Sequence, residues 1–207
     1  MIGDSIPWKD ELLRVAGRIE RKKPQKRWPE RSMFLLERDV MVSAYAVRKL
    51  IEARKVSDEL AAQTWPVRRH GLRGAAPDAW NRHEVEEVFD LEKSLGERLA
   101  SAELCNQIIH SWIWAPYWTW APETYERDLL AGIYVASDRK RRECLYSIDI
   151  DVVIELFRSV GSEEVVRTVM GPTPTACGGS YGSRPGSDDD VVGARAAQGR
   201  GPAALLT

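Results

Sequence analysis

The chain has 207 residues, a length typical of one domain of ordinary size or of one domain with a tail. Hydrophobic residues make up 43% of it and charged residues 29%, as in globular proteins, and the formal net charge is only -1. This balance excludes a global attraction to nucleic acid or to an anionic membrane, so any such attraction has to be local.

The amino terminus and the cysteines predict a cytoplasmic protein. Residues 1–11 lack the basic and apolar regions of a secretory signal, and polar residues interrupt every apolar stretch before the roughly 20 residues that span a bilayer. The three cysteines, Cys105, Cys144 and Cys177, are an odd number and have no Cys-x-x-Cys spacing, which favours reduced thiols. We therefore expect a cytoplasmic location and no membrane association.

Helices are expected in the first third of the chain. Between Pro7 and Lys23 the apolar residues recur at helical spacing, and Pro24 ends the pattern. Residues 33–55 carry a continuous apolar stripe, which is typical of a helix that faces the core. Glu37 and Asp39 lie in this second helix, where structural pairing explains them better than a catalytic role.

A long loop is predicted at about residues 66–84. This stretch is polar and is broken by Gly71, Gly74 and Pro77. An ordered loop of this length is often functional. Residues 85–92 then alternate imperfectly between apolar and polar side chains, and we interpret them as a strand, although their acidic residues also suit a helix.

Residues 111–122 contain four of the eight tryptophans, all at even positions. These are Trp112, Trp114, Trp118 and Trp120. In an extended chain they share one face, so we predict a strand, or two short strands hinged at Pro116. Four indoles on one face indicate core more often than a ligand platform, and we expect this strand in the middle of the sheet. If it lies at an edge, where proline is tolerated, a partner would first bind at residues 117–120.

A β-hairpin with a basic tip is predicted after the tryptophans. Residues 131–137 and 143–148 are rich in β-branched and aromatic side chains. The tip between them carries four consecutive basic residues, Arg139, Lys140, Arg141 and Arg142. Helices are expected on either side of the sheet segments, at residues 101–111 and 149–160, with Ser101 and Asp149 as caps.

Together these elements predict an α+β fold. A helical amino-terminal third precedes a small, mainly antiparallel sheet, and the helices at 101–111 and 149–160 cover one face of that sheet. The stretch from Gly171 onward contains eight of the 15 glycines and four of the 11 prolines, and Tyr181 is its only aromatic residue. We therefore predict one domain at residues 1–170 and a disordered low-complexity tail at 171–207.

Motifs of known chemistry are absent from the sequence. There is no phosphate-binding glycine loop and no nucleophile elbow, and three scattered histidines do not form a metal signature. We therefore expect neither a metal nor another cofactor. Cys105 and His110 share one predicted helix, but positions five apart diverge by about 140° and cannot pair. His110 adjoins the tryptophan segment and is a candidate binding residue for that reason.

Two classes of function remain. We prefer a non-enzymatic interaction protein that binds nucleic acid or a protein partner, because basic side chains neutralise phosphates and aromatic ones stack on bases. The candidate binding residues are Arg139, Lys140, Arg141, Arg142, Tyr117, Trp118, Trp120 and His110. The same basic tip would also protect an edge hairpin from aggregation. The alternative is a metal-dependent phosphodiester hydrolase that uses Asp149, Asp151 and Asp138, although helix capping explains Asp149 without a metal.

Overall fold

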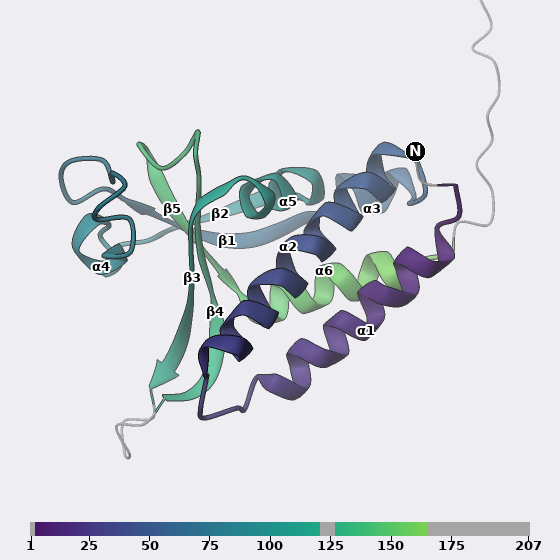
Figure 1. Cartoon of the computed structure of the whole chain (residues 1–207). Coiled ribbons are helices and arrows are strands. Elements are labelled where there is room, and N and C mark those ends of the chain that lie inside the picture. Colours follow the sequence, from purple (N-terminus) through teal and green to yellow (C-terminus); the bar gives the residue numbers. More distant parts are fainter. Residues whose placement is uncertain (1–2, 121–126, 165–207) are drawn as a thin grey trace, which may run out of the picture. The chain divides into compact units, whose positions relative to one another are not determined.

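The computed structural model describes residues 3–120 and 127–164, and the predicted tail at 171–207 lies outside these ranges. The described chain folds as a five-stranded antiparallel sheet with helices packed on one face (Figure 1). The strands are β1 Thr64–Gly71, β2 Leu95–Ala100, β3 Ser111–Trp120, β4 Arg127–Ser137 and β5 Cys144–Asp149, in the spatial order β2-β1-β5-β4-β3. The predicted α+β class is confirmed.

The helices are α1 Ile6–Lys22, α2 Glu30–Glu52, α3 Asp58–Ala62, α4 Val85–Val88, α5 Ser101–Ile109 and α6 Ile150–Ser162. The helices predicted at 7–23, 33–55, 101–111 and 149–160 are confirmed within a few residues. In the helical layer, α1 packs against α6 and α2 packs against α5. In the described part of the chain, no helix is long and apolar enough to cross a membrane.

Most of the core lies between this helical layer and the sheet. Fully buried residues such as Leu36, Ile133 and Phe157 belong to one large cluster there. Each such side chain contributes roughly 1.5–3 kcal/mol through the apolar surface that it removes from water. A smaller cluster around Phe89 and Leu145 lies on the opposite face of the sheet, which we call the outer face. Through this cluster, residues 72–91 pack on part of the outer face.

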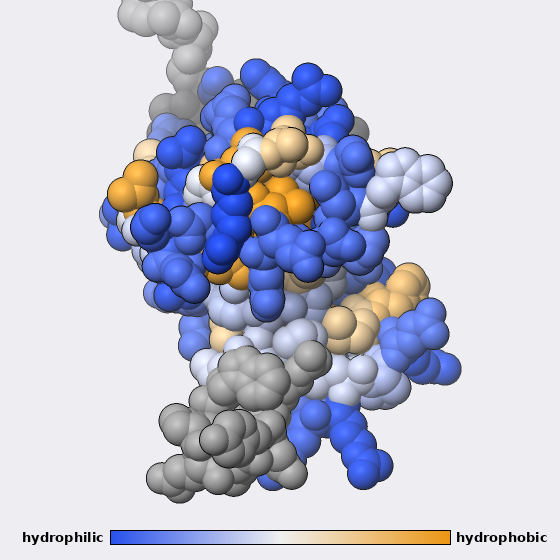
Figure 2. Space-filling model, turned by 90° about the vertical axis from the view of Figure 1, so that its left-hand side faces the viewer, coloured by the Kyte–Doolittle hydropathy of each residue, from blue (hydrophilic) through white to orange (hydrophobic). Residues whose placement is uncertain are grey.

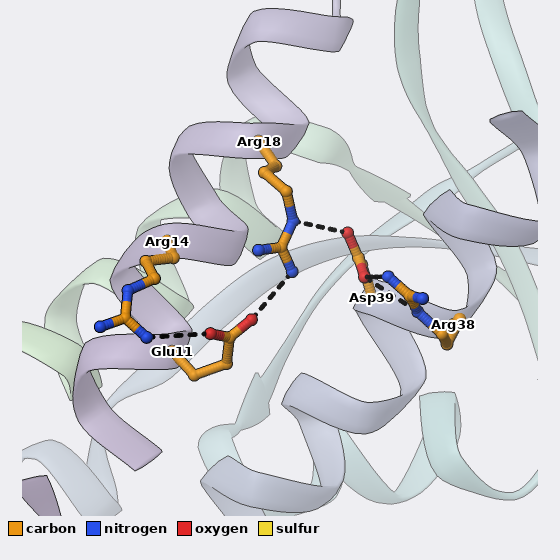
Figure 3. Close-up of polar contacts among 5 residues, drawn as sticks. All are labelled: Glu11, Arg14, Arg18, Arg38 and Asp39. Atoms are coloured by element: carbon orange, nitrogen blue, oxygen red, sulfur yellow. Dashed lines mark hydrogen bonds and ion pairs between the residues drawn. The ribbon is translucent and has the colours of Figure 1, made fainter. Parts of the chain in front are cut away.

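An ion-pair network joins the two long amino-terminal helices (Figure 3). Arg18 of α1 donates from Nε to Oδ2 of Asp39 in α2 over 3.0 Å, and Arg38 donates to the other oxygen over 2.7 Å. Glu11 accepts a further bond from Arg18 over 2.9 Å. Burial alone would raise the pKa of Asp39, but the bonds from Arg18 and Arg38 outweigh it and hold that pKa below its ordinary value. Asp39 is therefore a buried structural anion.

The region between α3 and β2 differs from the prediction. Residues 64–71 form β1, so the connection that follows is shorter than the predicted loop at 66–84. The expected strand near Val85 is the short helix α4 instead. Val85 and Val88 are three residues apart and both are buried beside Phe89, which requires the spacing of a helical turn rather than alternation.

The tryptophan strand is confirmed, but its place in the sheet is not. β3 is an edge strand and β5 is in the middle, which suits Pro116, because proline cannot donate to a neighbouring strand. A register shift between Ser111 and Ile113 breaks the alternation at Trp112. Trp114 and Trp118 therefore pack against the large cluster, whereas Trp112 packs against the small one, and the prediction of one shared face is wrong for Trp112. The side chain of Trp120 lies outside the described residues.

Candidate binding site on the outer face of the sheet

Four side chains from four strands meet on the outer face, beside the segment that contains α4. Arg68 comes from β1, Asp149 from the end of β5, Tyr134 from β4 and Tyr117 from β3. We call them the Tyr117 cluster. Figure 2 shows the side of the molecule that carries α4, where an apolar patch lies among hydrophilic side chains.

Tyr117 reaches Asp149 by lying across β4 at Gly132. A Cβ atom on Gly132 would overlap the Tyr117 phenol and the carbonyl oxygen of Ile148, so only glycine leaves room for the ring. The Tyr117 hydroxyl donates to Oδ1 of Asp149 over 2.7 Å. It also accepts a bond from Nη2 of Arg68 over 3.1 Å, and that nitrogen lies 2.6 Å from the same Asp149 oxygen.

The ring of Tyr117 is fixed as firmly as its hydroxyl. It stacks on Tyr134 with 4.5 Å between ring centroids and 29° between planes. Burial, and after it the bond to the Asp149 carboxylate, raises the pKa of Tyr117. Burial and the charge of Glu86 raise the pKa of Tyr134. Both phenols therefore keep their protons at neutral pH, and the cluster is organised before any ligand arrives.

A buried polar chain lies next to the cluster. Nε2 of His70 is 2.9 Å from Oγ of Ser147, and Nδ1 is 3.3 Å from the carbonyl oxygen of Asp90. Because a carbonyl only accepts, we assign the proton to Nδ1 and the donor role to the Ser147 hydroxyl. A serine paired in this way resembles a hydrolase nucleophile, but Ser147 is only 3% exposed and lies in mid-strand. The hydrogen bonds of His70 to Ser147 and to Asp90 therefore attach the loop around Asp90 to the sheet.

Two depressions flank the Tyr117 cluster. The larger, of about 540 Å³, lies between α4 and strands β3 and β4. Its lining includes Glu84, Glu86 and Glu87 on one side, and Tyr117 and Tyr134 on the other, and we call it the acidic pocket. The smaller, of about 300 Å³, lies over β1 and β2 beside Arg68 and Asp149. The larger volume is in the range of pockets that bind small molecules or single side chains.

The predicted basic hairpin is present, but part of its charge is paired within the fold. Lys140 bonds Glu143 over 2.7 Å, and Arg141 bonds Asp138 over 2.9 Å. Arg141 also donates to the carbonyl of Pro77 and lies 4.2 Å from the ring centre of Trp112. Arg139 and Arg142 are exposed.

The candidate binding residues fall into two separate places. His110 ends α5 and lines a third depression, of about 700 Å³, together with Arg139 and Lys140. Tyr117 and Trp118 line the acidic pocket instead. The structure therefore brings Arg139 and Lys140 to His110, and Arg141 to Trp112, but neither group lines the acidic pocket with Tyr117 and Trp118.

The three candidate catalytic aspartates each have a different partner. Asp149 bonds Arg68 and Tyr117, Asp151 bonds Lys23 over 2.7 Å, and Asp138 bonds Arg141. Within residues 3–120 and 127–164, no group of three His, Cys, Asp or Glu residues is placed to hold a metal ion. Asp149 does precede α6 as its N-cap, but its carboxylate bonds the Tyr117 cluster rather than the helix.

Ser101 is likewise not the cap that its sequence suggests. Ala100 precedes α5, and Ser101 is its first residue, fully buried. Its hydroxyl accepts from Nε1 of Trp65 over 2.9 Å and donates to the Leu60 carbonyl over 3.1 Å. Ser101 therefore joins α5 to β1 and α3.

Sequence reasoning missed three residues of the site, namely Arg68, Gly132 and Tyr134. Gly132 carried a usable signal, because a glycine inside a β-branched strand often marks a close approach of another group. Comparisons with protein-family models, curated proteins and solved structures found no match to this chain. The geometry of the site is therefore the basis for a function.

Proposed function

We propose that the protein is a non-enzymatic interaction protein that binds a partner polypeptide at the Tyr117 cluster. The observation that supports this most strongly is the rigid setting of Tyr117, which is held by Tyr134, Asp149 and Arg68 between two depressions. Tyrosine and arginine provide much of the energy of protein interfaces, most of all when they are fixed in advance. The Arg68 side chain is 49% exposed and can contact a partner.

A polypeptide suits this site better than a nucleic acid. Three glutamates line the acidic pocket, and their charges would repel phosphates. Arg139 and Lys140 of the basic tip line a separate depression, and two of the four cations of the tip, Lys140 and Arg141, are already paired. The hydrolase alternative has less support, because Asp138, Asp149 and Asp151 bond three different cations rather than one another.

Fluorescence anisotropy with labelled probes tests the proposal. The probes are short basic, neutral and acidic peptides and a single-stranded oligonucleotide, at about 50 mM and about 200 mM salt. We expect saturable binding of at least one peptide, which Tyr117→Ala and Arg68→Gln each weaken at least about tenfold. Tyr45→Ala, which removes an exposed tyrosine of α2, is the matched control and should leave binding unchanged.

Two outcomes would contradict this assignment. The first is that no peptide binds saturably, or that Tyr117→Ala binds as the wild type does. The second is oligonucleotide binding that survives Tyr117→Ala and disappears in Arg139→Ala/Arg142→Ala, which would make the basic tip a nucleic-acid site. Circular dichroism and urea unfolding show whether each variant is folded under the binding conditions.

A further inference from the structure

The described lining of the acidic pocket carries negative charge that the fold does not balance. Glu84, Glu86 and Glu87 line it, and none of the described residues that line it is a lysine or an arginine. Glu84 lies 3.7 Å from His83, a partner that is charged only when protonated. Within the described chain, Glu86 and Glu87 form no ion pair, and both are exposed. The pocket therefore offers carboxylates whose charge is not neutralised by the fold.

The other side of the pocket is aromatic. Tyr117 and Tyr134 are stacked and cannot turn away, because Asp149 and Arg68 hold the Tyr117 hydroxyl. The face of an aromatic ring is electron-rich and attracts a cation within about 6 Å of its centre. Burial is the main cause that raises the pKa of Tyr134, and the negative charge of Glu86 raises it further, whereas the charge of Arg68 lowers it. Glu86 therefore contributes negative potential at this ring. The rings and the carboxylates therefore both attract a positively charged ligand.

Arg68 is a cation that opposes this potential, because it bonds the Tyr117 hydroxyl and its charge acts on Tyr134. Its Nη2 atom is 2.6 Å from Asp149, and both residues line the smaller depression rather than the acidic pocket. Asp149 therefore neutralises Arg68, and the three glutamates of the acidic pocket keep their excess negative charge.

We infer that the acidic pocket binds an arginine side chain from a basic segment of the partner polypeptide. This inference rests on the proposed function, since it names the side chain that the partner inserts beside the Tyr117 cluster. A guanidinium is planar and weakly hydrated, so it can stack on a tyrosine ring while its N–H groups donate to carboxylates. A pocket of about 540 Å³ has room for such a side chain.

A pair of peptides isolates the charge of the inserted side chain. One labelled peptide contains arginine, and the second replaces each arginine by citrulline, which has nearly the same shape and no charge. We expect the arginine peptide to bind at least about tenfold more tightly at low salt, and its advantage to shrink as salt rises. Glu86→Gln/Glu87→Gln should remove most of this advantage and leave the citrulline peptide unaffected. Glu155→Gln, an exposed residue of α6, is the matched control.

The outcomes separate this inference from the proposed function. If both peptides bind equally and Tyr117→Ala weakens both, the arginine inference is overturned and the binding site at Tyr117 stands. If Glu155→Gln weakens the arginine peptide as much as the double variant does, the attraction is general charge and the inference also falls. If no peptide binds saturably, the proposed function itself fails.

Discussion

The hydroxyl of Tyr117 lies 2.7 Å from the carboxylate of Asp149, although the two residues belong to β3 and β5 and the whole of β4 runs between them. The distance is bridged by the ring of Tyr117, which lies over the backbone of β4 at Gly132. One residue without a side chain therefore determines where the central aromatic ring of the site lies. Arg68 then bonds both partners from β1 and extends the same network over four strands.

Gly132→Ala should disturb both the fold and the site. The added methyl group would overlap the Ile148 carbonyl and the Tyr117 phenol, and overpacking of this kind costs about 1–3 kcal/mol. We expect a lower free energy of unfolding in urea and weaker peptide binding. Gly71→Ala at the end of β1 is the matched control, because its Cβ would meet no atom within 4 Å. Equal losses in the two variants would contradict the role given to Gly132.

Except at residues 85–92, the sequence correctly predicted the elements whose evidence is local, and it failed where the evidence is distant. The apolar stripe of α2 and the β-branched residues of β4 and β5 lie within single elements, so they could be recognised. β1 could not be recognised, because it pairs with β2 and β5, which lie far along the chain, and Pro66 and two arginines conceal its alternation.

At the site, too, single residues could be recognised from the sequence, but their contacts could not. Tyr117 and Asp149 were both candidates, but for different reasons, one as an aromatic binder and the other as a metal ligand. Their contact depends on the strand order, which places β5 beside β4, and on Gly132 between them. Neither fact follows from residue spacing. The bulge at Trp112 is a further case, since a single extra residue cancels the parity from which one shared face was predicted.

Asp39→Asn should lower stability most at neutral pH. Asp39 is buried and bonded to Arg18 and Arg38, so loss of its charge should cost about 2 kcal/mol. Because its folded pKa is below the ordinary 3.8, this stabilisation is complete above that value and is lost as pH falls through the folded pKa. The difference in unfolding free energy between wild type and variant should therefore shrink in acid. Asp10→Asn, at an exposed position of α1, should show little effect at any pH.

Cys105 should be inert towards thiol reagents in the folded protein. Its side chain is fully buried, and burial raises its pKa to about 12, so almost none of it is thiolate at neutral pH. Labelling with iodoacetamide in a Cys177→Ser background should therefore modify Cys105 only after unfolding in urea. Rapid modification of the folded protein at Cys105 would show that α5 opens readily, against its buried position between α2 and the sheet.

Arg141→Ala should loosen the hairpin tip from the segment that carries α4. Arg141 stacks on Trp112 and donates to the Pro77 carbonyl over 2.9 Å, and contacts of this kind contribute about 1 kcal/mol each. We expect faster amide hydrogen exchange in residues 72–84, measured by mass spectrometry. Arg142→Ala is the matched control, because Arg142 is exposed. In this variant, residues 72–84 should exchange at the wild-type rate. If both variants exchange equally, the contacts of Arg141 with Trp112 and Pro77 do not hold the tip to this segment.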